Sequence, residues 1–119
     1  MNKKWIKLKS MGKLIVLMLP MLLLMPFLVA AEPTGLEVFD RLDCYKCHAS
    51  DHQKMGPALE KIAAAYGDKA KLLGFLNGKT DAIVSPEMAG SMIKQRKKIK
   101  TLSDAERNVL ADYIMAQKK

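Results

Sequence analysis

Cys44 and Cys47 are the only two cysteines in the 119 residues of the chain, and His48 follows the second one directly. The stretch reads Cys44-Tyr45-Lys46-Cys47-His48. Two thiols at this spacing have three common uses: a redox-active disulfide, a metal site, or the covalent attachment of a cofactor. The rest of the sequence decides between them, because each use needs a different fold around the two cysteines.

The first two uses find little support. A thioredoxin-type dithiol lies beside a βαβ pattern, and no stretch of this chain shows the alternating pattern of a strand. A zinc site needs four ligands, and the only soft donors within reach are Cys44, Cys47, His48 and His52, which lie within nine residues. A tetrahedron closed by so short a segment would strain the backbone, so zinc is disfavoured.

The third use depends on the histidine that follows Cys47 directly. In a C-x-x-C-H motif the two thiols add to the two vinyl groups of haem, and the histidine binds the iron from one face. Covalent attachment keeps haem on a small exported protein that would otherwise lose it. The motif therefore predicts one haem c, attached through Cys44 and Cys47 and bound at its iron by His48.

The N-terminal thirty residues predict export. Five lysines within the first thirteen residues precede an uncharged run from Leu14 to Ala30, and Val29-Ala30-Ala31 offers small residues for a peptidase. This order is typical of a secretory signal. An uncleaved membrane anchor is the alternative, although the run is short for a spanning helix and contains Pro20 and Pro26. We expect residues 1–31 to be a leader and residues 32–119 to be one periplasmic domain, either free or tethered to the outer side of the cytoplasmic membrane.

The positive charge of the chain belongs largely to this leader. Of the twenty Lys and Arg residues, five lie in the first thirteen positions, whereas all twelve Asp and Glu residues follow Ala31. The domain from residue 32 keeps fifteen basic and twelve acidic side chains, a net charge of +3. Composition therefore gives no reason to expect a nucleic-acid partner.

The domain itself predicts an all-α fold of about five short helices. Thr34 and Glu37 form a capping box, which starts a helix from Gly35 to Asp43 that would bury Leu36, Phe39 and Leu42. Further helices are expected over 59–66, ended by Gly67, over 69–76, over 87–98 and from a second capping box at 103–106 to about 116, with a loop over 79–86.

The residues alone leave two candidates for the ligand on the second face of the iron. His52 follows His48 by only four positions and Met55 is similarly close, so neither reaches the far face. Met115 lies in the last helix, where a methionine ordinarily packs in the core. Met88 and Met92 both follow the long loop, and both stay open at this point.

Taken together, residues 32–119 resemble a small monohaem class I c-type cytochrome of the bacterial kind. The C-x-x-C-H motif carries most of the resemblance, followed by Gly56-Pro57, which is similar to the family's turn whose proline carbonyl accepts the ring N–H of the haem histidine. Gly35 and Phe39 resemble the first-helix side of the family's helix crossing, and Leu110 and Tyr113 resemble its last-helix side.

The resemblance also bears on the sixth ligand. The family often has a methionine in an M-K-P-Q stretch before the last helix, and Met92-Ile93-Lys94-Gln95 resembles it. Met88, after a Ser-Pro-Glu stretch, resembles another form but lies farther from the last helix. The resemblance favours Met92, although the proline usual near this ligand is absent after either methionine.

A haem iron with histidine and methionine ligands has no open position, so the resemblance implies an electron carrier between larger redox proteins and not an enzyme. The alternative is a haem c protein with a labile sixth ligand that acts on a small molecule such as peroxide or nitric oxide. A basic run follows Met92 and is either a solvated helix face or a docking surface for an acidic partner; it comprises Lys94, Arg96, Lys97, Lys98 and Lys100.

Overall fold

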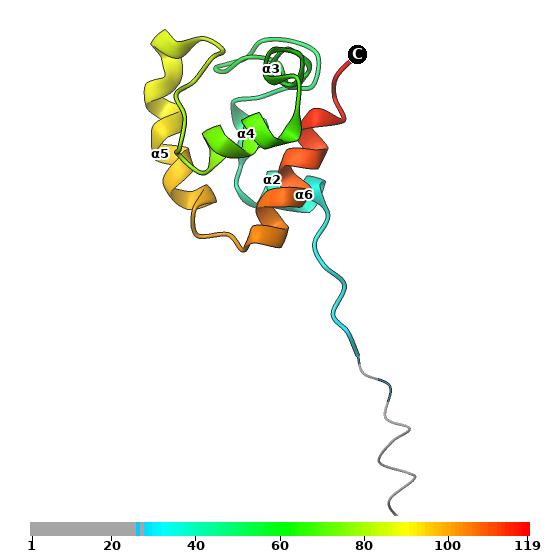
Figure 1. Ribbon diagram of the computed structural model, residues 1–119. Coiled ribbons are helices and arrows are strands. Elements are labelled where there is room, and N and C mark those ends of the chain that lie inside the picture. The colour runs from blue at the N-terminus through cyan, green and yellow to red at the C-terminus, as the bar shows by residue number, and fades with distance from the viewer. Residues whose placement is uncertain (1–25, 27) are drawn as a thin grey trace, which may run out of the picture. The chain divides into compact units, whose positions relative to one another are not determined.

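The computed structural model describes Pro26 and residues 28–119. The residues from Glu32 to Lys119 form one compact unit, built from helices (Figure 1). The elements are α2 (Gly35–Arg41), η1 (Cys44–Lys46), α3 (Leu59–Tyr66), α4 (Lys69–Leu76), η2 (Pro86–Met88), α5 (Ala89–Ile99) and α6 (Asp104–Met115).

The described part of the chain contains no strand, and its one β-bridge joins His48 to Gln53. The prediction of an all-α fold is therefore confirmed. The predicted leader lies almost entirely outside the described residues. No helix in the described ranges is long and apolar enough to cross a membrane.

The first and last helices of the domain cross at Gly35. A Cβ atom on this glycine would lie 2.1 Å from the Val109 carbonyl oxygen and 2.5 Å from the Tyr113 Cβ. Any larger residue would push the helices apart, so the glycine permits the close crossing that the resemblance implied. Beside it, the rings of Phe39 and Tyr113 pack with their centroids 5.2 Å apart.

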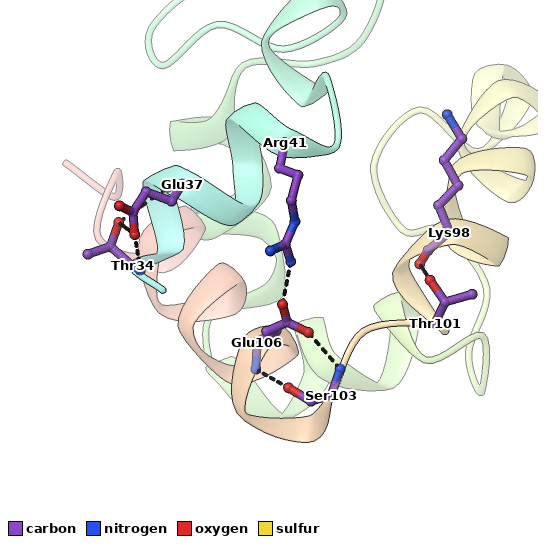
Figure 2. Close-up of polar contacts among 7 residues, drawn as sticks. All are labelled: Thr34, Glu37, Arg41, Lys98, Thr101, Ser103 and Glu106. Atoms are coloured by element: carbon purple, nitrogen blue, oxygen red, sulfur yellow. Dashed lines mark hydrogen bonds and ion pairs between the residues drawn. The ribbon is translucent and has the colours of Figure 1, made fainter. Parts of the chain in front are cut away.

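Both helices of this crossing begin with a capping box, as expected (Figure 2). The Thr34 backbone N–H donates to the Glu37 carboxylate over 2.6 Å, and the Ser103 backbone N–H donates to Glu106 over 2.9 Å. Glu106 also pairs with Arg41 of α2. The cap of α6 is thereby joined to α2, which adds a polar contact to the apolar crossing.

The core lies where α2, α3 and α4 pack against α6. One detail of the predicted core is wrong: α2 buries Val38 and Phe39, whereas the side chain of Leu36 is 47 % exposed and Leu42 is only partly buried. The helix ends two residues earlier than predicted, at Arg41. Its buried stripe is set by the crossing with α6, which brings Val38 inward.

The long loop after α4 leads into η2 and then α5. The sequence predicted a helix from Glu87, and the structure has a 3₁₀ turn there, so that the α-helix proper begins at Ala89. Ser85 precedes η2 in the left-handed backbone region, with φ 47°. The backbone of α5 packs mainly against η2, its neighbour in sequence, and Figure 1 shows α5 on the side of α4 away from α6.

Candidate functional site

A mostly apolar cavity of about 780 Å³ lies in the domain. Its walls come from two stretches far apart in sequence. Cys44, Cys47 and His48 line it from one stretch, and Met88 and Met92 line it from the other. Core residues from α2, α3, α4 and α6 close it behind, among them Phe39, Leu59, Leu72, Phe75 and Leu110. The residues predicted to hold the cofactor and the residues of the hydrophobic core thus line the same cavity.

The two cysteines are placed by a tight turn after α2. Asp43 has a left-handed backbone, with φ 59°, and η1 follows at once from Cys44 to Lys46. Aspartate is among the few residues that adopt this region with ease. The Cys47 and His48 backbone N–H groups both donate to the Cys44 carbonyl, over 3.1 and 2.9 Å. One local turn therefore directs both thiols and the imidazole to the same cavity.

The imidazole of His48 is fixed by a backbone carbonyl. Its Nδ1 lies 2.7 Å from the Pro57 oxygen. Because a carbonyl oxygen only accepts, Nδ1 carries the proton of this hydrogen bond. The other ring nitrogen, Nε2, then has a free lone pair, which is the form that binds a metal ion. The resemblance predicted this hydrogen bond, and the structure contains it.

Gly56 packs flat against the same imidazole. A Cβ at this position would lie 2.6 Å from His48 Cε1 and 3.0 Å from its Nδ1. The Gly56 backbone N–H donates to the Cys47 carbonyl over 2.8 Å, so the glycine cannot move aside without breaking the loop. The sequence showed Gly56 only as part of a turn, and its contact with the ring was missed.

The thiol of Cys44 is unsuited to redox exchange. Burial raises its pKa to about 11, and nearby Cys47, Asp43 and Asp40 act in the same direction. Reactive dithiols have lowered pKa values, because the thiolate is the nucleophile. Both thiols are free, and the setting of Cys44 argues against the thioredoxin alternative.

The zinc alternative also fails. Within the described residues, no three His, Cys, Asp or Glu side chains come together to hold a metal ion. His52, the fourth donor considered, is exposed and its Nδ1 lies 2.8 Å from Asp51.

Both candidate methionines line the cavity, together with Met55 at its rim. Met88, in η2, is 49 % exposed. Met92 lies one turn into α5 and packs against the core cluster. Met92 therefore has its surroundings set by the core, whereas Met88 and the largely exposed Met55 do not.

The predicted basic run is not uniform. Lys94, Lys97, Lys98 and Lys100 are exposed, but Arg96 is only partly exposed and turns inward to the end of α4. Its Nη1 donates to the Thr80 carbonyl over 3.1 Å and lies 3.4 Å from the Phe75 carbonyl. Arg96 is therefore engaged within the domain, a role that its place in a basic run did not indicate.

These residues fit a covalently attached haem. The cavity has the size and apolar lining of a site for a large cofactor, two free thiols enter it, and an oriented imidazole stands beside them with its unprotonated nitrogen available. When bound, haem supplies one-electron chemistry at its iron, and the protein contributes ligands, burial and orientation.

Comparison with known proteins agrees with this fit. A search of curated proteins found no match. The family model described as "Cytochrome c" matches residues 34–118, a range that contains every element from α2 to α6. The chain therefore belongs to the cytochrome c family, as a small class I c-type cytochrome that carries haem c.

Proposed function

We propose that this cytochrome is an electron shuttle whose haem is attached to Cys44 and Cys47 and whose iron is bound by His48 and Met92. The observation that carries the proposal is that His48 and Met92 come from distant segments and line one cavity. The Pro57 carbonyl orients His48 by accepting a hydrogen bond from its Nδ1. This hydrogen bond makes the imidazole a stronger ligand for the iron, as the hydrogen-bonded partners of metal-binding histidines do.

The ligand pair determines the function. Two protein ligands leave the iron no open position for a substrate, so its oxidation state changes with little movement of ligands or water. A thioether ligand also raises the reduction potential. Such a site suits transfer between larger redox proteins better than catalysis on a small molecule.

Carbon monoxide binding to the reduced protein tests the ligand pair. We expect the wild-type protein and Met88→Ala to bind it weakly, and Met92→Ala to bind it strongly, because only the loss of the true ligand opens the iron. The variants are matched, since each shortens a methionine that lines the same cavity. Strong binding by Met88→Ala alone would assign the ligand to Met88. Strong binding by the wild-type protein would favour the small-molecule alternative.

The exposed lysines of α5 and its C-terminal cap form the proposed docking surface, which comprises Lys94, Lys97, Lys98 and Lys100. Lys98 also lines the mouth of the haem cavity. Positive charge there would steer an acidic partner toward the haem. Arg96 is left out, because its guanidinium is engaged within the domain.

Neutralising the four lysines to glutamine is expected to slow electron transfer to an acidic partner protein at low ionic strength and to leave the reduction potential nearly unchanged. Salt should remove the difference, because it screens exposed charges. Lys61→Gln on α3, an exposed lysine elsewhere, is the control. Equal rates for all three proteins at low salt would refute the docking surface.

We further propose that residues 1–31 direct export and that the domain works in the periplasm. The basic and apolar parts of the leader and the small residues before Glu32 support this. The intact mass of the natively exported protein checks it, since it reports removal of the leader and addition of haem in one measurement. A mass that retains all of residues 1–31 would indicate an anchor.

A further inference from the structure

Arg96 makes three contacts with the end of α4 and the loop that follows it. Its Nη1 lies 3.1 Å from the Thr80 carbonyl oxygen and 3.4 Å from the Phe75 carbonyl oxygen. Its guanidinium carbon lies 4.8 Å from the centre of the Phe75 ring. One side chain of α5 thus reaches the last turn of α4, the ring of Phe75 and the beginning of the long loop.

This contact matters because α5 has few other contacts with distant parts of the chain. Its backbone packs mainly against η2, and Ile99 is its one fully buried residue, at the C-terminal end. Besides Arg96, Gln95 donates from its Nε2 to the Leu42 carbonyl over 2.6 Å. The position of the N-terminal half of α5 therefore depends on the packing of Met92 against the core cluster and on the polar contacts of Gln95 and Arg96.

The chemistry of these contacts suits arginine in particular. Carbonyls in the last turn of a helix carry partial negative charge, which a cation stabilises. A guanidinium donates in several directions and stacks on an aromatic face, whereas the compact ammonium of lysine does not do both well. Phe75 in turn packs on Tyr66, with ring centroids 5.8 Å apart, and both rings line the haem cavity.

We propose that Arg96 is a positioning residue that holds α5 against the end of α4 and so keeps Met92 in reach of the haem iron. The inference rests on the proposed ligation by Met92. Arg96 lies four residues after Met92, one turn along the same helix, where two side chains are neighbours on one side. Loosening the helix at Arg96 would therefore increase the fraction of time that the iron lacks its thioether ligand.

Carbon monoxide affinity of the reduced holoprotein measures this fraction directly. A ligand that binds only the open form has an apparent Kd equal to its intrinsic Kd divided by the open fraction. For Arg96→Met, which keeps an apolar stem but loses charge and donors, we expect affinity at least tenfold higher than wild type, or about 1.4 kcal/mol. Arg96→Lys should lie between the two, since it keeps only the charge.

Two controls separate positioning from charge and from general stability. Lys61→Met removes one positive charge from an exposed position of α3, outside the docking surface, and should bind carbon monoxide as the wild type does. Arg41→Met breaks the pair with Glu106 between α2 and α6 and should lower the denaturant midpoint without raising the affinity. A second readout is the methionine–iron charge-transfer band of the ferric protein, which should weaken in Arg96→Met only.

The outcomes distinguish the positioning role of Arg96 from the proposed ligation of the iron by Met92. If the wild-type protein already binds carbon monoxide as tightly as Met92→Ala does, ligation by Met92 is wrong and the inference falls with it. If the wild type resists and Arg96→Met resists equally, Met92 stands and the role of Arg96 is wrong. If Arg41→Met opens the iron as much as Arg96→Met does, the effect is one of general stability and the inference is again wrong.

Discussion

The two sides of the haem cavity are held in different ways. On the histidine side, backbone hydrogen bonds join residues close in sequence: the Gly56 N–H donates to the Cys47 carbonyl over 2.8 Å, and the Leu59 N–H donates to the Ala49 carbonyl over 2.9 Å. On the methionine side, α5 reaches distant parts of the chain through the side chains of Gln95 and Arg96.

We call the side that carries His48 the histidine wall and the side that carries Met88 and Met92 the methionine wall. The histidine wall is held by its own backbone, whereas the methionine wall is held by side-chain contacts. A loop closed by its own backbone hydrogen bonds depends less on distant parts of the chain, and it holds His48 through Cys47, Gly56 and Pro57. The position of α5 depends on single side chains instead: the polar contacts of Gln95 and Arg96 and the packing of Met92 and Ile99 against the core. We therefore expect substitutions to act sharply on the histidine side and more gently on the methionine side.

Glycine-to-alanine substitutions probe the two walls with the same chemical change. The larger effect is expected for Gly56→Ala, because the added Cβ would lie 2.6 Å from His48 Cε1 and the ring is held by Pro57. Forcing a methyl group into such packing typically costs about 1–3 kcal/mol. Denaturant unfolding of the holoprotein and its reduction potential measure the loss of stability and the displaced ligand. An unchanged reduction potential would show that the loop accommodates the methyl group without displacing His48, contrary to this prediction.

The matching change on the other wall is Gly90→Ala, near the start of α5. Nothing lies within 4 Å of a Cβ at this position, and alanine favours a helix over glycine by up to about 1 kcal/mol. We expect a small gain in the free energy of unfolding and an unchanged potential. If Gly90→Ala and Gly56→Ala destabilised equally, the contrast between the two walls would be lost.

The smallest effect is expected at the crossing of α2 and α6, away from the two methionines. The Ser103 backbone N–H and then Arg41 lower the pKa of Glu106 below its ordinary value of 4.5. Because the native pKa is lowered, the stabilisation is present above pH 4.5 and is lost as pH falls through the native value. Glu106→Gln should therefore be less stable than wild type at pH 7, and the difference should shrink by pH 3.

Urea unfolding at the two pH values measures this difference, with Glu87→Gln on η2 as an exposed control. A difference between Glu106→Gln and wild type that stays constant from pH 7 to pH 3 would contradict the assignment. The reduction potential should not change in either variant, because neither Glu106 nor Glu87 lines the cavity.

The contrast between the walls also explains what the sequence could predict. The histidine wall is encoded by neighbouring residues, so Cys44, Cys47 and His48 could be named from one motif, and Pro57 through the resemblance to the family's Gly-Pro turn. The capping boxes at Thr34 and Ser103 are local too, and α6 begins where predicted. Gly35 was identified through its resemblance to a known helix crossing, and the structure has the close contact.

The methionine wall could not be predicted to the same depth. Met88 and Met92 both follow a loop whose path depends on long-range contacts. Such contacts cannot be predicted from the local sequence pattern. Arg96 lies among lysines and looks like one more surface charge, while its partners, Phe75 and Thr80, are 21 and 16 residues earlier. Likewise, Leu36 fits a buried stripe by periodicity, but in the helix that packs against α6 it is Val38 that is buried.

The contact between Gly35 and Val109 also sets an order of events during biogenesis. The two ends of the domain meet each other, so the first helix lacks its main packing partner, α6, until the end of the domain has been synthesised. Contacts between residues so distant in sequence slow folding, because a long loop must close first. The C-x-x-C-H turn lies inside that loop, and an enzyme that attaches haem therefore has a period in which Cys44 and Cys47 are accessible, before closure of the chain buries the Cys44 thiol.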